Sequence, residues 1–357
     1  MRFHAKEPQV KTSGRTLYRD NVRFLGYSGS SVTFRFHGKK ATAHLLSNIA
    51  EHEPFHHAWV AVYLNGENEP VKRFSLDAAE ADYILYEGKE DTDVTLTVCK
   101  YSEPEYASCG IAWIETDSKE LLDPPAKKSR RIQIIGDSIT CGYGVEGSIN
   151  DMVHETAKEN PAKAYSLLTA KALDAELEIV AWNGKGVITQ YVGEEENVPV
   201  NDWLVPMLYE YIDAGCEKDY FHRKKEDWEL WDHSSYIPDL VIIYLGTNDA
   251  SYTRDIPARN KEFEDAYTAF LERIHKNHPA AKILCTLGTM DQRLCASVET
   301  AVNTFLSMHP EAKAFYLGLP MQEESDGLGT FWHPTAATHK KAAALITAKA
   351  KEIMGWE

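Results

Sequence analysis

Positively charged side chains are scarce in this chain of 357 residues. Its 38 lysines and arginines face 54 aspartates and glutamates, which leaves a formal net charge of −16 at pH 7. A surface of that sign repels the phosphates of nucleic acids and the headgroups of anionic lipids. We therefore expect neither a nucleic acid nor a membrane as a partner, and a neutral substrate fits the charge better.

Long apolar runs are absent as well. No stretch approaches the roughly 18 apolar residues that predict a transmembrane helix. The first segment, MRFHAKEPQVKTSGRT, contains no apolar run of the kind that secretory signals carry. On this pattern we expect a cytoplasmic protein.

The six cysteines form no Cys-x-x-Cys pair and show no zinc-binding spacing. Cys99 in LTVCKY and Cys285 in ILCTLG lie in apolar runs, which is typical of buried free thiols. The histidines of EHEPFHH (residues 51–57) lie in a predicted turn without other ligands at matching spacing. We therefore expect no metal site.

The spacing of apolar residues changes along the chain. The chain is also long enough for two domains. From about residue 17 to residue 115, segments such as SVTFRFHG, AWVAVYLNG, ADYILYEG and TDVTLTVCKY alternate and are rich in β-branched and aromatic residues. Short strands of this kind predict a β-sandwich that is jelly-roll-like. A Pro-Pro pair at residues 124–125 then predicts a linker, so we assign residues 1–125 to the first domain.

Residues 126–357 show a different pattern. The apolar runs IQIIG, LEIVAW, LVIIYLG and KILCTLG alternate with helical stretches near KAYSLLTAKAL, EFEDAYTAFLERIHK and THKKAAALITAKAKEIM. Continuous Val/Ile/Leu runs between helices indicate a parallel sheet that is covered on both faces. The second domain is therefore predicted to be a three-layer α/β/α domain.

Three of the predicted strands end in polar turns that contain glycine. IQIIGDSIT supplies Asp137 and Ser138, LEIVAWNGKG supplies Gly184, and LVIIYLGTND supplies Asn248 and Asp249. In a parallel sheet these turns share one edge, where ligands bind in open α/β folds. The sequence therefore predicts a site at this edge.

Acyl transfer needs a nucleophile, a base, donors for the oxyanion and a group that orients the base. Ser138 is the candidate nucleophile, and its own N–H, the N–H of Gly184 and the side-chain amide of Asn248 are the candidate oxyanion donors. His333, in GLGTFWHPTAATH just before the last helix, is the candidate base. Its loop follows the last strand and so returns to the same edge of the sheet.

Each of these residues also has an ordinary interpretation when it is taken alone. A serine after a strand is usually a turn or cap residue, a glycine there usually serves backbone geometry, and an Asn-Asp pair commonly forms an Asx-turn. A histidine before a helix is commonly a surface group, and we interpret Asp137 as structural. The conjunction of all the required groups is what favours a hydrolase.

The combination of the three strand-end turns with the late His-Pro motif resembles the SGNH (GDSL-type) hydrolase superfamily. The matching blocks are GDSIT at 136–140, NGKG at 183–186, GTND at 246–249 and WHP at 332–334. A jelly-roll-like domain before the hydrolase, together with YIPDLVIIYLGTND, is similar to carbohydrate esterase family 2, the acetylxylan esterase family. The resemblance implies a deacetylase without metal or organic cofactor, in which Ser138 is the nucleophile and His333 the base.

The chain departs from the superfamily pattern at two positions. Asn183 stands where a serine is common, which we expect to be tolerated because the N–H of Gly184 is the donor. An aspartate commonly stands three residues before the histidine, and here that position is Thr330. The resemblance allows a Ser-His dyad in which a backbone carbonyl holds the imidazole, and this is the arrangement we favour. Asp326 is the alternative, because Gly327 and Gly329 make its loop adaptable.

The predicted reaction is release of acetate from acetylated xylo- or manno-oligosaccharides through an acetyl-enzyme. Trp332 adjoins the base and Trp182 adjoins the oxyanion turn, so either could stack on a sugar ring, although tryptophans more commonly belong to a core. Two alternatives stay open: a lipid or thioester esterase of the same superfamily, and a carbohydrate-binding protein with an inert hydrolase domain.

Overall fold

The computed structural model describes residues 1–357, and its contacts divide the chain into two compact units. Unit 1 comprises Met1–Lys127, His154–Glu159 and Ile212–Glu229, and unit 2 comprises Lys128–Val153, Asn160–Tyr211 and Leu230–Glu357. The domain boundary at 125/126 stays a prediction. No helix combines the length and the apolar character that crossing a bilayer requires.

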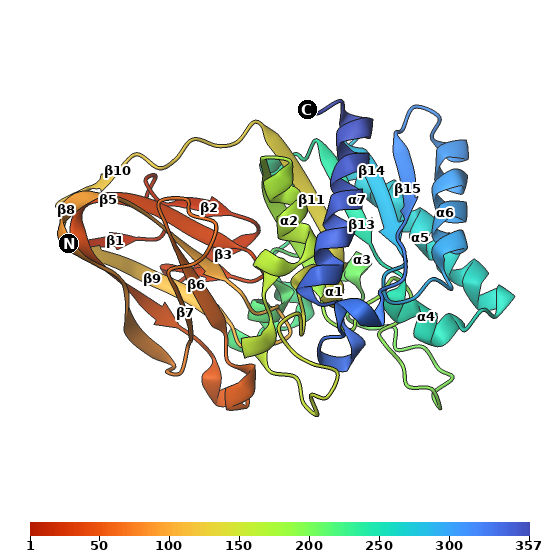
Figure 1. Cartoon of the computed structure of the whole chain (residues 1–357), viewed down its shortest axis with the longest axis horizontal. Coiled ribbons are helices and arrows are strands. Elements are labelled where there is room, and N and C mark those ends of the chain that lie inside the picture. Colours follow the sequence, from red (N-terminus) through yellow and green to blue (C-terminus); the bar gives the residue numbers. More distant parts are fainter. The chain divides into compact units, whose positions relative to one another are not determined.

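Unit 1 is built on one antiparallel sheet (Figure 1). The strand order is β3-β4-β9-β5-β8-β6-β7, with β1 paired to β9 and with β2 and β10 paired to β5. The strands are β1 (Arg2–His4), β2 (Lys11–Ser13), β3 (Thr16–Arg19), β4 (Val22–Leu25), β5 (Ser31–Leu46), β6 (Trp59–Leu64), β7 (Lys72–Ser75), β8 (Glu80–Lys100), β9 (Cys109–Thr116) and β10 (Leu121–Leu122).

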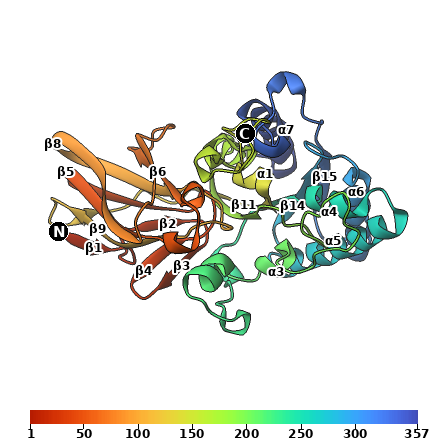
Figure 2. The same cartoon turned by 90° about the horizontal axis from the view of Figure 1, so that it is seen from below.

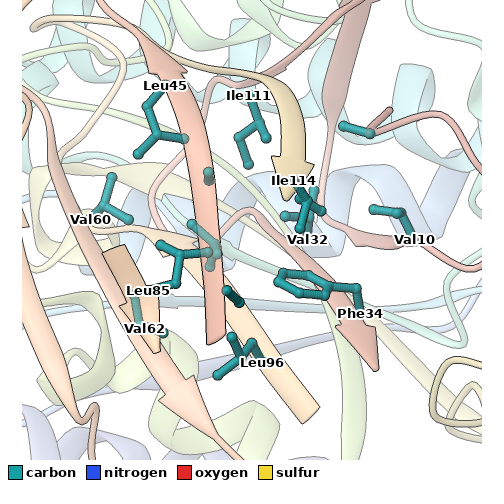
Figure 3. Close-up of a cluster of buried hydrophobic side chains, with 14 of the residues drawn as sticks. Val10, Val32, Phe34, Leu45, Val60, Val62, Leu85, Leu96, Ile111 and Ile114 are labelled. Atoms are coloured by element: carbon teal, nitrogen blue, oxygen red, sulfur yellow. The ribbon is translucent and has the colours of Figure 1, made fainter. Parts of the chain in front are cut away.

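The core of unit 1 is formed by apolar side chains of this sheet (Figure 3). Along β5 the buried residues are first the even-numbered ones, such as Val32 and Phe34, and then the odd-numbered ones, such as Ala43 and Leu45. The change of parity coincides with the register shifts between residues 38 and 42. This irregular pairing turns the following side chains of β5 to the other face, which keeps the apolar set on the core side.

Unit 2 contains a five-stranded parallel sheet in the order β12-β11-β13-β14-β15. Its strands are β11 (Arg130–Asp137), β12 (Ala175–Trp182), β13 (Leu240–Tyr244), β14 (Lys282–Leu287) and β15 (Ala314–Gly318). Every residue of β13 is buried, as expected for a strand that is covered on both faces. The direction of strand addition reverses between β11 and β13, and ligands bind at such a switch point.

Helices cover both faces of the parallel sheet. They are α1 (Ser138–Cys141), α2 (Tyr165–Ala172), α3 (Val205–Leu208), α4 (Thr247–Thr253), α5 (Pro257–Asn277), α6 (Cys295–Met308) and α7 (Ala336–Met354). α2 packs against α7, and α5 packs against α6. Figure 2 shows α7 and α5 on opposite sides of β14, which gives three layers.

The prediction of an antiparallel β domain followed by a parallel α/β domain is confirmed by the arrangement of these strands. The closer likeness of the first domain to a jelly roll stays a prediction. ADYILYEG and TDVTLTVCKY are predicted to be separate strands, but both belong to the single strand β8, which pairs with β5 on either side of a register shift at residues 88–91.

Candidate active site

Ser138 occupies the sharp turn between β11 and α1. The Asp137 carboxylate caps the helix by accepting a hydrogen bond from the N–H of Ile139 at 3.0 Å. A Cβ on Gly136 would lie 2.0 Å from Thr140 Oγ1, so only glycine fits before the turn. The interpretation of Asp137 as a structural acceptor agrees with this cap. The turn presents the Ser138 hydroxyl at the carboxyl end of β11.

His333 lies between the short helical turn η9 (Thr330–Trp332) and α7. Its Nε2 is 2.8 Å from Ser138 Oγ, although 195 residues separate the two in the sequence. Its Nδ1 is 3.0 Å from the carbonyl oxygen of Thr330. A carbonyl oxygen only accepts hydrogen bonds, so Nδ1 carries the proton and Nε2 accepts from the serine hydroxyl.

The two candidates for orienting His333 are distinguished by their contacts. The Thr330 carbonyl meets the imidazole, and it also accepts the backbone N–H of His333 at 3.1 Å. The Asp326 carboxylate instead forms an ion pair with Lys341 Nζ at 2.7 Å. The structure therefore brings Thr330 to the imidazole through its backbone and leaves Asp326 away from it.

Gly184 and Asn248 lie on the rim of the same cleft as Ser138. Gly184 has φ +69°, a left-handed conformation that favours glycine, and no atom lies within 4 Å of the position that a Cβ would occupy. The Asn248 amide donates to the carbonyl of Lys185 at 3.1 Å and makes a longer contact of 3.4 Å with the Asp137 carboxylate. The short bond fixes the amide plane, and the other N–H is held only weakly.

Asp249 joins the second and third blocks, a role that sequence reasoning did not assign. Its buried carboxylate accepts the backbone N–H groups of Val187, Ile188 and Thr189 at 2.8–3.3 Å. Burial raises the pKa of Asp249 to about 6, and these three N–H donors oppose the rise. A Cβ on Gly186 would lie 2.4 Å from Asp249 Oδ2, which explains the second glycine of NGKG.

The cleft has a volume of about 520 Å³. Trp332 is 58% exposed on its lining, whereas Trp182 is only 2% exposed and packs edge-on against Trp203, with the ring centres 5.8 Å apart. Trp182 is not part of the lining, so its suggested role as a sugar platform is wrong. It ends β12, where its side chain turns into the packed layer and away from the cleft.

Sequence reasoning missed other residues of the cleft. Tyr191 is 63% exposed there, and Met290, Asp291 and Arg293 also line it. Arg293 is held by the Asp291 carboxylate, with Nε 3.0 Å from Oδ2. A signal was available, because KILCTLG was predicted as a strand of the same parallel sheet, and the residues after it therefore had to lie at the same edge.

Comparison with known families assigns both parts of the chain. A model of the family described as "GDSL-like Lipase/Acylhydrolase family" matches residues 134–341. A model described as "Carbohydrate esterase 2 N-terminal" matches residues 12–125. The first match covers more than half of the chain and contains every residue of the proposed constellation.

Two curated relatives match almost the whole chain. "Cellulase/esterase CelE" of Acetivibrio thermocellus is 29% identical over 98% of this chain and 40% of its own length, so the chain spans about two fifths of that relative. "Acetylxylan esterase / glucomannan deacetylase" of Cellvibrio japonicus is 27% identical over 99% of this chain and 91% of its own length.

Solved structures show the same two-part architecture. A family two carbohydrate esterase from Clostridium thermocellum, determined in complex with cellohexaose, superposes with a TM-score of 0.83 at 29% identity, covering 98% of this chain and all of that one. A family two carbohydrate esterase from Cellvibrio japonicus superposes with a TM-score of 0.85 at 25% identity, covering 100% of this chain and 98% of that one.

Proposed function

Because this chain belongs to the GDSL-like lipase/acylhydrolase family and carries a carbohydrate esterase 2 N-terminal domain, we propose that it is a carbohydrate esterase that releases acetate through a Ser-His mechanism. The observation that carries the proposal is the hydrogen bond of 2.8 Å between His333 Nε2 and Ser138 Oγ. A hydroxyl that donates to a correctly oriented imidazole can be deprotonated as it attacks an ester carbonyl.

In the acylation step, Ser138 Oγ forms a bond to the acetyl carbonyl carbon while its proton passes to His333 Nε2. The imidazolium then protonates the sugar oxygen, which leaves as a hydroxyl and generates the acetyl-enzyme. In the second step, water gives its proton to Nε2, attacks the same carbon and releases acetate, and the proton returns to Ser138. The Thr330 carbonyl holds Nδ1–H throughout, which keeps the ring in the productive tautomer.

The oxyanion of each tetrahedral intermediate needs donors at the cleft rim. We assign this role to the N–H groups of Ser138 and Gly184 and to the weakly held N–H of Asn248. Donors that are fixed before the reaction stabilise the developing charge without reorganising, and each is worth about 10²–10³ in rate. Asp249 supports this set by holding the residues that follow Gly184.

The proposed substrate is an acetylated xylo- or manno-oligosaccharide. Three observations support it: the names of the curated relatives, the neutral character of such a substrate beside a chain of net charge −16, and an exposed tryptophan on the cleft. The face of an indole ring supplies a large apolar contact for a sugar at little conformational cost.

Trp332→Ala is expected to raise KM for an acetylated oligosaccharide by about tenfold, the equivalent of ~1.4 kcal/mol, because it removes the stacking surface. For nitrophenyl acetate, which has no sugar to stack, KM should change by less than about threefold. Steady-state kinetics on both substrates measure the difference. The matched control is Trp356→Ala, since Trp356 packs against Arg130 and not on the cleft. Equal effects on both substrates would contradict the assignment.

The direct test of function is acetate release from a panel of acetylated xylo- and manno-oligosaccharides, read by product mass. We expect loss of acetyl groups with the wild-type chain and none with Ser138→Ala. Octanoyl and acetyl nitrophenyl esters are compared in the same assay. Faster turnover of the octanoyl ester would instead assign a lipid or thioester esterase, and oligosaccharide binding without turnover would assign an inert binding protein.

A further inference from the structure

Thr330 is bonded through its side chain as well as through its carbonyl. It is fully buried, and its hydroxyl donates to Asp151 Oδ2 at 2.6 Å, across 179 residues of sequence. The backbone N–H of Ser148 donates to the same oxygen at 2.9 Å. A hydroxyl that donates to a carboxylate forms one of the stronger hydrogen bonds in proteins, so Asp151 fixes the side chain of Thr330 firmly.

The backbone of Thr330 is held by the same neighbouring segment. Its N–H donates to the carbonyl of Gly144 at 3.2 Å. A Cβ on Gly144 would lie 2.7 Å from Thr330 Cβ, and a Cβ on Gly147 would lie 1.9 Å from Thr330 Oγ1. Because both positions are glycine, residues 144–151 pack directly against Thr330, and a side chain at either position would clash with it. Side chain and backbone are restrained together, so the carbonyl has a fixed position.

A second feature makes this restraint necessary. Phe331 and Trp332, which separate the carbonyl from the imidazole, have φ values of +51° and +62°. Two consecutive residues other than glycine in the left-handed region are strained, and such strain persists only where the surroundings over-determine the conformation. Without an anchor at Thr330, this turn would relax and the carbonyl would move away from His333 Nδ1.

We propose that Asp151 is a positioning residue for the reaction: by holding the Thr330 hydroxyl, it fixes the carbonyl that orients His333. The inference rests on the proposed function. The chain of contacts runs from Asp151 Oδ2 to Thr330 Oγ1, and from the Thr330 carbonyl to His333 Nδ1 and on to Ser138 Oγ. Asp151 is not among the residues that line the cleft, so its effect falls on the chemical step and leaves substrate binding unchanged.

The test compares Asp151→Ala, which removes the acceptor, with Thr330→Val and the double variant, and uses Thr330→Ser as the conservative replacement. Each single variant is expected to lower kcat by about 10- to 100-fold, because a displacement of about 1 Å in a catalytic group has effects of that size. KM should stay within about twofold. The double variant should be no slower than the worse single one, because both changes break the same bond. Thr330→Ser should retain kcat within about threefold.

Thr169→Val is the matched control, since Thr169 is a fully buried threonine of unit 2 whose hydroxyl has no partner. It should leave kcat unchanged. Unchanged kcat in Asp151→Ala would overturn the proposal, and so would effects that multiply in the double variant. If Thr330→Val does not fold, Asp151→Ala and Thr330→Ser still decide the question.

A second readout does not depend on turnover. The hydrogen-bonded Nδ1–H of His333 should give a downfield proton resonance in the NMR spectrum of the wild-type chain. This resonance should shift or broaden in Asp151→Ala and be unchanged in Thr169→Val. If the wild-type chain releases no acetate but the resonance still responds to Asp151→Ala, the proposed function fails while the positioning contact stands. An unchanged resonance would reject the positioning role.

Discussion

Ser138→Ala is expected to lower kcat for acetate release by about 10⁴-fold or more, because the variant has no nucleophile to form the acetyl-enzyme. The fold should survive, since the change removes one hydroxyl and its hydrogen bond with His333, a loss of about 1 kcal/mol. Acetate release at saturating substrate measures the first effect, and thermal unfolding measures the second.

The control for this prediction is Ser307→Ala, on the exposed face of α6, where the hydroxyl bonds only to the carbonyl of Thr304. Its kcat should equal that of the wild type. A Ser138→Ala variant that keeps more than about a hundredth of the wild-type kcat would show that another group attacks the ester.

The second large effect is predicted for the base. His333→Ala should also lower kcat by about 10⁴-fold or more, because no other group accepts the proton of Ser138. Combining Ser138→Ala with His333→Ala should add little to either single change, since the two residues act as a unit. Single-turnover kinetics of nitrophenyl acetate hydrolysis measure the acylation step directly.

Asp326→Asn is the informative companion of His333→Ala. The Asp326 carboxylate pairs with Lys341, and the Thr330 carbonyl holds the imidazole, so the asparagine variant should keep kcat within about threefold. A loss of about 10⁴-fold, the size expected when the orienting carboxylate of a triad is removed, would show that Asp326 moves to His333 during the reaction.

Much of the fold could be predicted, because strand and helix signals are local. Four of the five parallel strands were visible as continuous apolar runs, and α5 and α7 as periodic helical patterns, whereas β15 was not predicted. α6 was missed: CASVETAVNTFLSM is rich in valine, threonine and serine, which have lower helix propensity than alanine or leucine. Its buried residues Val298, Ala301, Val302 and Phe305 nevertheless keep helical spacing, so a periodicity count would have found it.

Local sequence patterns could not show that unit 1 is built from separate segments of the chain. Residues 154–159 and 212–229 lie within the predicted second domain, 126–357, but belong to unit 1 by their contacts. Glu159, for example, accepts the backbone N–H of Glu103 at 2.7 Å, and His154 bonds to Glu159 at 2.8 Å. Such contacts depend on where the chain returns in space, which neither composition nor periodicity reports.

The site divides in a similar way. Ser138, Gly184 and Asn248 could be predicted because the ends of parallel strands share an edge, and His333 because its loop had to return there. The group that orients His333 could not be predicted, because every residue has a backbone carbonyl and the sequence does not show which one contacts the imidazole. The left-handed conformations of Phe331 and Trp332 were also unforeseeable, because residues other than glycine rarely adopt them.

The most direct measurement of the Ser-His mechanism is labelling with a serine-directed fluorophosphonate, followed by mass spectrometry of the digested chain. A single adduct on Ser138 is expected in the wild type, with labelling slowed by orders of magnitude in His333→Ala. No adduct on Ser138, or labelling at the same rate without the imidazole, would contradict this mechanism.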